Sequence, residues 1–311
     1  CLAQGALPSS IGSISVPTAG QANGTFGGNL DLKPEKSTSW SVGGIWQPTF
    51  APGLSLTVDY YNIVVTDAIT ELTPGDAITA CFGDNPLSPA AGSSLTEACR
   101  SIQRNAITGS LSGESTEVPG MSLQTSNQGR LATDGVDFSL NYGHDFGKVG
   151  WDIAISGNWT NKSTFQAAPG LIVRDCVDKF GANCGSIQPD WQWSVRNNLA
   201  IGDFDISLLW RHLTKVEYEY AYDPADGAFE GTIKGGNLNG KEADFNFIPA
   251  YDMFDLSARF NVNENFTFTL AISNLFDKQP KVVGNSIGST SFNSGNVYPS
   301  TYDALGRRFN V

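Results

Sequence analysis

A strict two-residue alternation of apolar and polar side chains limits the fold of this chain more than any other feature. From Val149 to Thr160 the alternation keeps its phase over a dozen residues. Successive side chains of a β-strand point to opposite faces, so the pattern predicts a strand with one apolar and one polar face. Strands of soluble proteins usually have about 5–6 residues. The length of this segment therefore favours a membrane-spanning strand of a β-barrel.

The same alternation recurs along the chain and predicts about nine strands. They lie near residues 40–46, 54–60, 136–142, 149–160, 191–201, 204–210, 254–260, 266–272 and 307–311. Trp151 and Trp159 share the apolar phase, and a tilted strand would separate them by roughly 20 Å along a barrel axis. That distance approaches the height of the apolar band of a membrane barrel, whose borders carry aromatic girdles. Tryptophans in the core of a soluble sandwich are the alternative interpretation.

The connections between these strands alternate between short and long. The short ones are 48–53, 143–148, 202–203 and 262–265, and the long ones are 67–128, 166–189, 218–249 and 277–301. Outer-membrane barrels have tight periplasmic turns and long extracellular loops, so this alternation follows from their topology. We therefore predict that the four long connections and residues 1–36 are extracellular loops, and that residues 37–311 supply barrel strands.

Composition excludes two other classes of protein. The net charge of −12 argues against a nucleic-acid partner, because phosphates require a basic surface. An acidic chain suits cation-bridged lipopolysaccharide, although solubility explains the balance equally well. The sequence has no apolar run of about 18 residues, so it predicts no transmembrane helix.

Nine strands are too few for an independent membrane barrel. Bacterial barrels close with an even number of strands, and an open sheet would leave unpaired backbone groups in lipid. We therefore expect the chain to form part of a larger barrel.

Five sequence blocks resemble TonB-dependent outer-membrane receptors, and they occur in the family's order. They are Asn-Leu-Asp-Leu-Lys-Pro-Glu-Lys-Ser at 29–37 with Trp40 and Gly43; Gly-Leu-Ser-Leu-Thr-Val-Asp-Tyr-Tyr-Asn-Ile at 53–63 with Asp-Ala-Ile at 67–69; Thr-Asp-Gly-Val-Asp-Phe at 133–138; Ser-Asn-Leu-Phe-Asp-Lys-Gln-Pro at 273–280; and Tyr-Asp-Ala-Leu-Gly-Arg-Arg-Phe at 302–309. Each block is weak evidence alone, but together they span nearly the whole chain.

The resemblance implies an all-β fold, namely an antiparallel transmembrane β-barrel of 22 strands around an N-terminal plug, of which this chain supplies the nine C-terminal strands. It also implies active import of a scarce nutrient, such as a ferric siderophore, cobalamin, a sugar or a peptide, energised through TonB. The TonB box and the plug would lie upstream. Family chains usually end on an aromatic residue, whereas this one stops at Val311. We expect outer-membrane lipid, lipopolysaccharide and a surface lipoprotein or other envelope protein as further partners.

All five cysteines fall in predicted extracellular segments, where oxidation is favoured. Cys81 with Cys99, and Cys176 with Cys184, are close in sequence and lie on the same connections. We predict two disulfides, because a metal site would need closer spacing or histidine partners. For Cys1 we expect a partner in the upstream chain, and a lipid-anchored N-terminus is the alternative.

The phase of each strand also predicts which side chains face lipid and which face the lumen. Girdle candidates, with packing inside a loop as the alternative for the tyrosines, are Trp151, Trp159, Trp210, Tyr218, Tyr220 and Tyr222. Residues of the polar phase, expected to face the lumen and mostly a plug, are Arg196, Arg211, Lys215, Glu217 and Arg259.

No motif in the sequence supports an enzyme, a metal site or a cofactor. Gly284 to Gly288 matches the pattern of a nucleophile elbow around Ser286, but no histidine follows it. Ser94 to Glu97 is a capping-box pattern and predicts a short helix in the longest loop. The alternative function is a secreted all-β binding or adhesion protein with a soluble sandwich fold. An outer-membrane enzyme barrel would need a catalytic pair at the rim, which the sequence does not offer.

Overall fold

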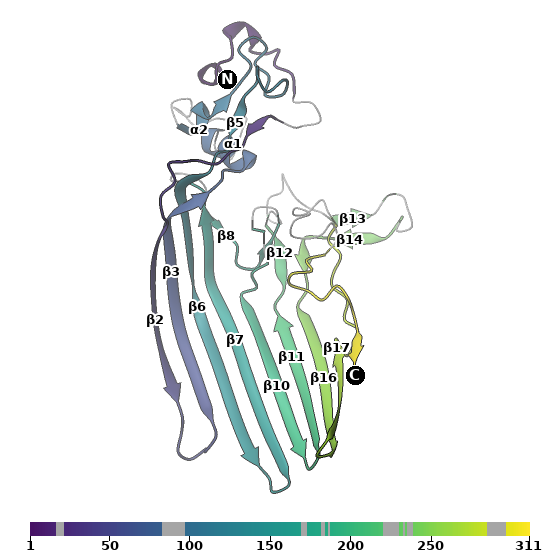
Figure 1. The fold of residues 1–311 in the computed structure, drawn as a ribbon. Coiled ribbons are helices and arrows are strands. Elements are labelled where there is room, and N and C mark those ends of the chain that lie inside the picture. The colour runs from purple at the N-terminus through teal and green to yellow at the C-terminus, as the bar shows by residue number, and fades with distance from the viewer. Residues whose placement is uncertain are drawn as a thin grey trace. The chain divides into compact units, whose positions relative to one another are not determined.

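The computed structural model describes residues 1–16, 22–82, 97–168, 173–181, 184–185, 187–219, 230–232, 234, 239–284 and 297–311. Its largest element is an antiparallel sheet, which we call the wall (Figure 1). The wall strands are β2 Lys36–Trp46, β3 Ser55–Thr70, β6 Ser126–Asp145, β7 Val149–Gln166, β10 Trp191–Ile201, β11 Phe204–Leu213, β16 Tyr251–Asn263, β17 Phe266–Ser273 and β18 Arg308–Asn310. The short strand β8 (Arg174–Asp175) also pairs with β7.

The strand order confirms the predicted architecture. Each of the nine wall strands pairs with its neighbour in sequence, and β2 and β18 are the two edges of the sheet. The connections alternate between short and long, as the sequence predicts, and the short ones lie together at one end of the strands (Figure 1). The sheet does not close on itself within the described residues, which agrees with a fragment of a larger barrel.

Several wall strands are longer than the alternation indicates, as β6 and β7 illustrate. The strand β6 has 20 residues and begins at Ser126, about ten positions before the apolar phase becomes regular. The strand β7 continues to Gln166 and has 18 residues. The additional residues of these strands include polar side chains on both faces. A search for one apolar and one polar face therefore does not detect them.

The pairing register shows that the wall has an apolar face and a polar face. One cross-strand row of the apolar face is Ile153, Asn197, Leu208, Leu256 and Ile272. Trp151, Phe138 and Leu208, which the sequence predicts to point outward, are only partly buried, and Phe268 is 51% exposed. The two buried clusters of the described residues lie in the connections and at one end of the wall. The dry core that a sandwich requires between two sheets is therefore not found in the described part of the chain.

The chain divides into two compact units. The first unit consists of Cys1–Thr38, Val64–Ala132 and Thr164–Arg174. It contains the helices α1 (Pro74–Phe82) and α2 (Glu97–Arg100) and a small sheet of β1 (Gly24–Thr25), β5 (Gly120–Ser122) and β4 (Ile102–Gln103). Two short 3-10 helices, η1 (Leu2–Gln4) and η2 (Pro8–Ser10), precede them. The described part of residues 1–36 belongs to this unit, and its assignment to the extracellular side stays a prediction.

A disulfide lies in the core of the first unit. We call this cluster the disulfide core; it consists of Ala77, Cys81, Cys99, Ile102, Met121 and Leu123. The N-terminal segment binds to it through Gln4, whose side chain accepts a hydrogen bond from Arg104 Nε at 2.6 Å and whose amide lies 3.4 Å from Cys81 Sγ. The backbone of Asn23 lies so close to Gly120 that any side chain there would collide with it, and Gly120 has a φ of 74°.

The second unit consists of Ser39–Ile63, Thr133–Ser163 and Asp175–Val311. Besides most of the wall, it contains a sheet of β15 (Phe247–Ile248), β12 (Val216–Tyr218) and β9 (Lys179–Phe180), and a pair formed by β13 (Glu230–Thr232) and β14 (Glu242–Asp244). Its buried cluster, which we call the tyrosine core, consists of Phe180, Ile187, Val216, Tyr218, Ile248, Tyr251, Met253, Val283, Tyr298 and Tyr302. Burial raises the pKa of the Tyr298 phenol to about 12, so this hydroxyl is neutral at physiological pH.

The described helices are short. None of them is long and apolar enough to cross a membrane. The helix α2 begins at Glu97, where the sequence predicts a short helix, while Ser94 lies outside the described residues. The sequence analysis missed α1, although Thr73 and Asp76 form a reciprocal cap at its start and Pro74 is its first residue.

Candidate functional site: the polar face of the wall

Three of the predicted lumen-facing residues share the polar face. Arg196 and Arg211 lie on β10 and β11, and Arg259 lies on β16. Arg211 Nη2 lies 2.6 Å from Asp255 Oδ2, and Arg259 donates to Asp205 Oδ2 from both Nε and Nη2, at 2.9 and 2.6 Å.

Arg196 has a different partner, because its Nη1 donates to Ser207 Oγ at 3.2 Å. The positive charges of Arg211 and Arg259 are therefore locally balanced by carboxylates.

A shallow hollow of about 400 Å³ lies on the wall where β7, β10 and β11 adjoin. Its lining residues are Ser156, Gly157, Asn158, Gln192, Trp193, Ser194, Arg211, His212 and Leu213. The register places them in three rows: Ser156–Ser194–Arg211, Gly157–Trp193–His212 and Asn158–Gln192–Leu213. The first and third rows have the phase of the polar face. Their side chains therefore form the sides of the hollow, and the backbone of the middle row forms its floor.

Hydroxyl and amide groups dominate the sides of this hollow. Ser156 Oγ and Ser194 Oγ lie 2.9 Å apart, within hydrogen-bond distance. Asn158 Nδ2 donates to Asp137 Oδ1 at 2.8 Å and to the Tyr61 hydroxyl at 3.1 Å, which fixes the orientation of the amide. Leu213 at the other edge packs against the tyrosine core. The hollow therefore has hydroxyl and amide groups among its side chains, and these side chains are held in place on two sides.

A glycine gives Tyr61 the space to reach Asn158. A side chain at Gly135 would lie 2.2 Å from the carbonyl oxygen of Trp159 and 2.6 Å from the Tyr61 hydroxyl. The preceding Asp134 is buried, and its Oδ2 accepts hydrogen bonds from Tyr60 and Asn161. The Thr-Asp-Gly-Val-Asp block thus connects three neighbouring strands, β3, β6 and β7.

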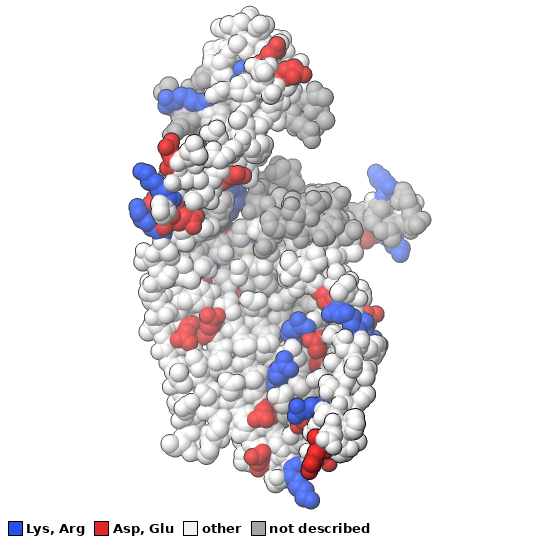
Figure 2. Space-filling model, viewed as in Figure 1, with Lys and Arg blue, Asp and Glu red and all other residues white. Residues whose placement is uncertain are grey.

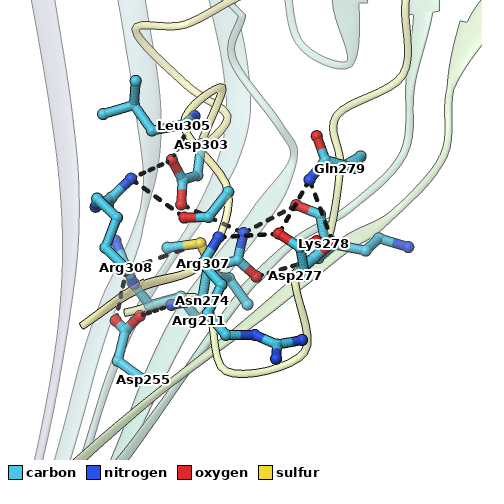
Figure 3. A network of polar contacts seen from close by, with 12 residues as sticks. Arg211, Asp255, Asn274, Asp277, Lys278, Gln279, Asp303, Leu305, Arg307 and Arg308 are labelled. Atoms are coloured by element: carbon cyan, nitrogen blue, oxygen red, sulfur yellow. Dashed lines mark hydrogen bonds and ion pairs between the residues drawn. The ribbon is translucent and has the colours of Figure 1, made fainter. Parts of the chain in front are cut away.

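The two C-terminal sequence blocks form one polar network, shown in Figure 3. Asn274 is fully buried and is its centre. Its backbone N–H donates to Asp255 Oδ1, and its side-chain amide donates to Lys278 O and to Asp303 Oδ2. Asp303 also accepts a hydrogen bond from Arg308 Nη1 at 2.9 Å. Asp255 binds Arg211 through its other oxygen, so the network extends to the polar face.

Backbone conformation explains why Asn or Asp occupies three positions of the family-like sequence blocks. Asp67, Asn274 and Asp277 have φ values of 55°, 54° and 54°. Among residues with a Cβ atom, Asn and Asp tolerate this left-handed conformation best. Asp277 also accepts a hydrogen bond from the backbone N–H of Arg307 at 2.9 Å, which ties the start of the last connection to its end.

The first sequence block is held within the first unit. Glu35 Oε1 accepts a hydrogen bond from Ile69 N at 2.7 Å, and Lys36 pairs with Asp67 at 2.8 Å. Asn127 bonds to both the N–H and the carbonyl of Lys33, and it also donates to Asp67 O. These contacts join the ends of β3 and β6 to the start of β2, so the block has a structural role here.

The aromatic residues of the apolar phase form clusters with neighbouring strands. Trp151 contacts Tyr142, Trp159 contacts Trp191, and Trp210 stacks on Phe254, with ring centroids about 6 Å apart. Their assignment to membrane girdles stays a prediction. The sequence analysis missed a polar group on this face: Asp252 accepts hydrogen bonds from Trp210 Nε1 and lies 2.7 Å from His212 Nδ1. His212 in turn stacks on Trp193.

Tyr218 packs inside a connection, which is the alternative that the sequence leaves open for the tyrosines. It is buried in the tyrosine core, because the chain leaves the wall after Leu213. Two other predicted positions need correction. For the same reason Lys215 and Glu217 are not on the polar face. Lys215 forms an ion pair with Glu217, and Glu217 also pairs with Lys179 near β12. Tyr220, Tyr222 and Ser286 lie outside the described residues.

The cysteines pair as the sequence analysis expects. Disulfides join Cys81 to Cys99 and Cys176 to Cys184, and Cys1 is exposed and has no disulfide partner in the structure. No cluster of three or more His, Cys, Asp or Glu side chains suited to a metal ion occurs among the described residues. In Figure 2 the charged residues form small separate patches, and most of the strand surface seen from this side carries neither sign.

The sequence of this chain matches the profile of the TonB dependent receptor-like β-barrel over residues 6–275. The chain belongs to this family. It is a family of outer-membrane transporters and receptors rather than of enzymes, and its members reside in the bacterial outer membrane. No curated protein matches the sequence.

Solved structures of outer-membrane receptors share the fold of the chain. A mutant ferric enterobactin receptor from Pseudomonas aeruginosa, in complex with enterobactin, has a TM-score of 0.51 and 14% identity over 91% of this chain. The outer membrane transporter YddB from Escherichia coli has a TM-score of 0.51 and 11% identity over 93% of this chain. The chain spans 32% and 34% of the lengths of these two proteins.

Proposed function

We propose that this chain supplies part of the barrel of an active outer-membrane transporter and that its polar face lines the route of the solute. The observation that carries the proposal is the two-faced wall. Its apolar face has no covering layer among the described residues, and its polar face holds ordered hydroxyl, amide and ion-paired groups. Lipid on one side and water with solute on the other is the environment that such a sheet requires.

The topology supports an orientation in the membrane. The four short turns would be periplasmic, and the four long connections together with residues 1–36 would be extracellular. The two disulfides support the same assignment, because both lie in the long connections and form under oxidising conditions. Selection of the solute would then take place among the long connections and along the polar face.

The partners follow from this placement. The family implies that the TonB system energises transport and that the cargo is a small nutrient such as a ferric siderophore, cobalamin, a sugar or a peptide. Lipid would cover the apolar face, and lipopolysaccharide would contact its outer border. A surface lipoprotein or another envelope protein would meet the long connections.

Transport can be tested in cells that express the intact receptor containing this chain. Uptake of candidate nutrients should require both the receptor and a functional TonB, and it should stop when the proton gradient is dissipated. A strain that lacks TonB but displays the same amount of folded receptor is the matched control. Uptake that persists without TonB would contradict the proposal.

A further inference from the structure

The hollow on the polar face has a distinctive chemistry. Four of its six side-chain positions are uncharged hydrogen-bonding groups, namely Ser156, Ser194, Asn158 and Gln192. These side chains offer both donors and acceptors. Its one charged group, Arg211, already binds Asp255 at 2.6 Å. A solute in the hollow would therefore meet hydroxyls and amides and little net charge.

The surrounding wall does not favour an anion. On the polar face, Arg211 and Arg259 are each paired with an aspartate. Asp137 lies beside the hollow through its hydrogen bond to Asn158, and no ion pair neutralises it among the described residues. Because Asp137 adds negative charge next to the hollow, an anionic solute would be repelled there.

The charge of the long connections also disfavours an anionic solute. Asp and Glu outnumber Lys and Arg in the segments 67–128 and 218–249, and none of the other long connections has a large excess of basic residues. The net charge of the chain is −12. Charge of one sign around an opening raises the local concentration of solutes of the opposite sign and lowers that of like-charged solutes. An anionic metal chelate would approach such a surface slowly.

We propose that the hollow is a subsite for an uncharged, polyhydroxylated solute of the carbohydrate class. Gln192 presents a planar amide that can donate to one hydroxyl and accept from the next. The donors of Asn158 are used by Asp137 and Tyr61, so its carbonyl oxygen is what it can offer, and the paired serines extend this row of partners. This inference rests on the proposed transport function and adds the class of solute to it. The competing occupant is another part of the receptor that covers the hollow permanently.

The class of solute can be identified by offering cells a mixture of candidate solutes that compete for uptake. Cells with the intact receptor receive neutral oligosaccharides, ferric citrate and a ferric catecholate together, and TonB-dependent accumulation is followed by mass spectrometry. We expect the neutral oligosaccharides to accumulate. Accumulation of the anionic iron complexes instead would overturn the subsite proposal while leaving transport intact. If no solute of this pool accumulates in a TonB-dependent manner, the subsite proposal fails, whereas the transport function fails only if cobalamin and peptides do not accumulate either.

Two matched variants locate the subsite. Gln192→Leu removes an amide from the side of the hollow, and Asn198→Leu makes the same change on the same face of β10 outside its lining. Loss of hydrogen bonds worth about 1.4 kcal/mol corresponds to roughly tenfold weaker binding. We expect oligosaccharide uptake at low concentration to fall about tenfold in Gln192→Leu and to stay unchanged in Asn198→Leu. Equal uptake by both variants would overturn the proposal.

Accessibility separates a solute subsite from a permanently covered surface. Ser194→Cys places a thiol in the hollow, and a polar maleimide should label it in energised cells. Added oligosaccharide should slow this labelling. A thiol that never reacts, in receptor shown to be folded, would mean that another part of the receptor covers the hollow, which would overturn the inference.

Discussion

The first unit and the wall are stabilised in opposite ways. The first unit buries its own apolar residues around a disulfide, and Ala77 and Leu123 are fully inaccessible there. The wall instead leaves its apolar face uncovered, and all eleven residues of β2 are exposed. The first unit therefore satisfies its hydrophobic surface internally, whereas the wall requires lipid and the neighbouring strands of a larger barrel.

The two regions also differ in the range of the contacts that order them. The wall derives its order from a ladder of backbone hydrogen bonds between sequence neighbours. The first unit brings together residues about a hundred positions apart, as in the hydrogen bond between Arg104 and Gln4. Such a unit changes as a whole when one of its contacts is lost, so perturbations of the first unit should leave the wall strands of the second unit intact, and the reverse should also hold.

The largest expected effect comes from the buried ion pair of the first unit. Arg174 pairs with Asp76, whose side chain is 1% exposed, and Asp76 also caps α1 through Thr73. Arg174→Met would leave the carboxylate buried without its cation, which costs about 3–5 kcal/mol. Hydrogen exchange in the intact receptor should show faster exchange in α1 and unchanged exchange in β10 and β11.

An exposed ion pair of the same unit provides the control. Lys36→Met breaks the pair with Asp67. The two side chains are 77% and 45% exposed, so solvent screens the interaction and the change should leave stability nearly unaltered. If Lys36→Met loosens α1 as much as Arg174→Met does, burial is not the reason for the effect.

The second expected effect concerns the disulfide core. Replacing both Cys81 and Cys99 by serine removes a cross-link across 18 residues, which is worth about 3 kcal/mol. Limited proteolysis of the intact receptor should then cleave within the first unit and spare the wall. The same double replacement at Cys176 and Cys184 is the matched control, because that disulfide lies in the second unit. Identical cleavage patterns for the two variants would contradict the independence of the units.

The sequence predicts the wall far better than the two cores. Alternation is a local signal, so it identifies all nine strands, their order and the two edges. It also places Arg196, Arg211 and Arg259 on one face, because strict phase carries that information along a strand. Beyond the end of a strand, the alternation no longer predicts which face a side chain occupies. Tyr218 and Glu217 keep the numerical phase of β11, but they belong to β12, where tertiary packing decides which side is buried.

The sequence predicts the disulfide between Cys81 and Cys99. The hollow and the packing around this disulfide were beyond sequence reasoning for a different reason. The hollow depends on which residues of three strands lie opposite one another, and register is set by pairing rather than by any single segment. In the first unit, the contact between Asn23 and Gly120 joins segments that share no local pattern. The cap formed by Thr73, Pro74 and Asp76 is a further signal that the sequence could have revealed.

The third expected effect tests lipid contact by the wall. Leu208 lies in the middle of the apolar face, and Ser207 is its neighbour on the polar face, beside Arg196. Leu208→Glu should destabilise the barrel by about 2 kcal/mol, because a charge at mid-membrane depth is unfavourable. Ser207→Glu should be nearly neutral, since the new carboxylate faces water and a guanidinium. The measurement is urea unfolding of the intact receptor in liposomes, and equal losses for the two variants would argue for a soluble fold.

The smallest expected effect distinguishes two hydroxyls in the tyrosine core. The Tyr251 hydroxyl donates to Lys278 O at 3.1 Å, whereas the buried Tyr302 hydroxyl has no hydrogen-bond partner among the described residues. Tyr251→Phe should therefore cost about 1 kcal/mol, the usual net value of one hydrogen bond. Tyr302→Phe removes an unsatisfied polar group and should leave stability unchanged or slightly higher.

Hydrogen exchange of β12 and β15 in the intact receptor measures both changes, because these strands pack into the same core. Faster exchange in Tyr251→Phe together with unchanged or slower exchange in Tyr302→Phe is the expected pattern. The reverse order would show that the Tyr302 hydroxyl has a partner outside the described residues, such as a buried water. A buried polar contact of Tyr302 would then help to stabilise the tyrosine core, whereas the disulfide core is stabilised by apolar packing and a cross-link.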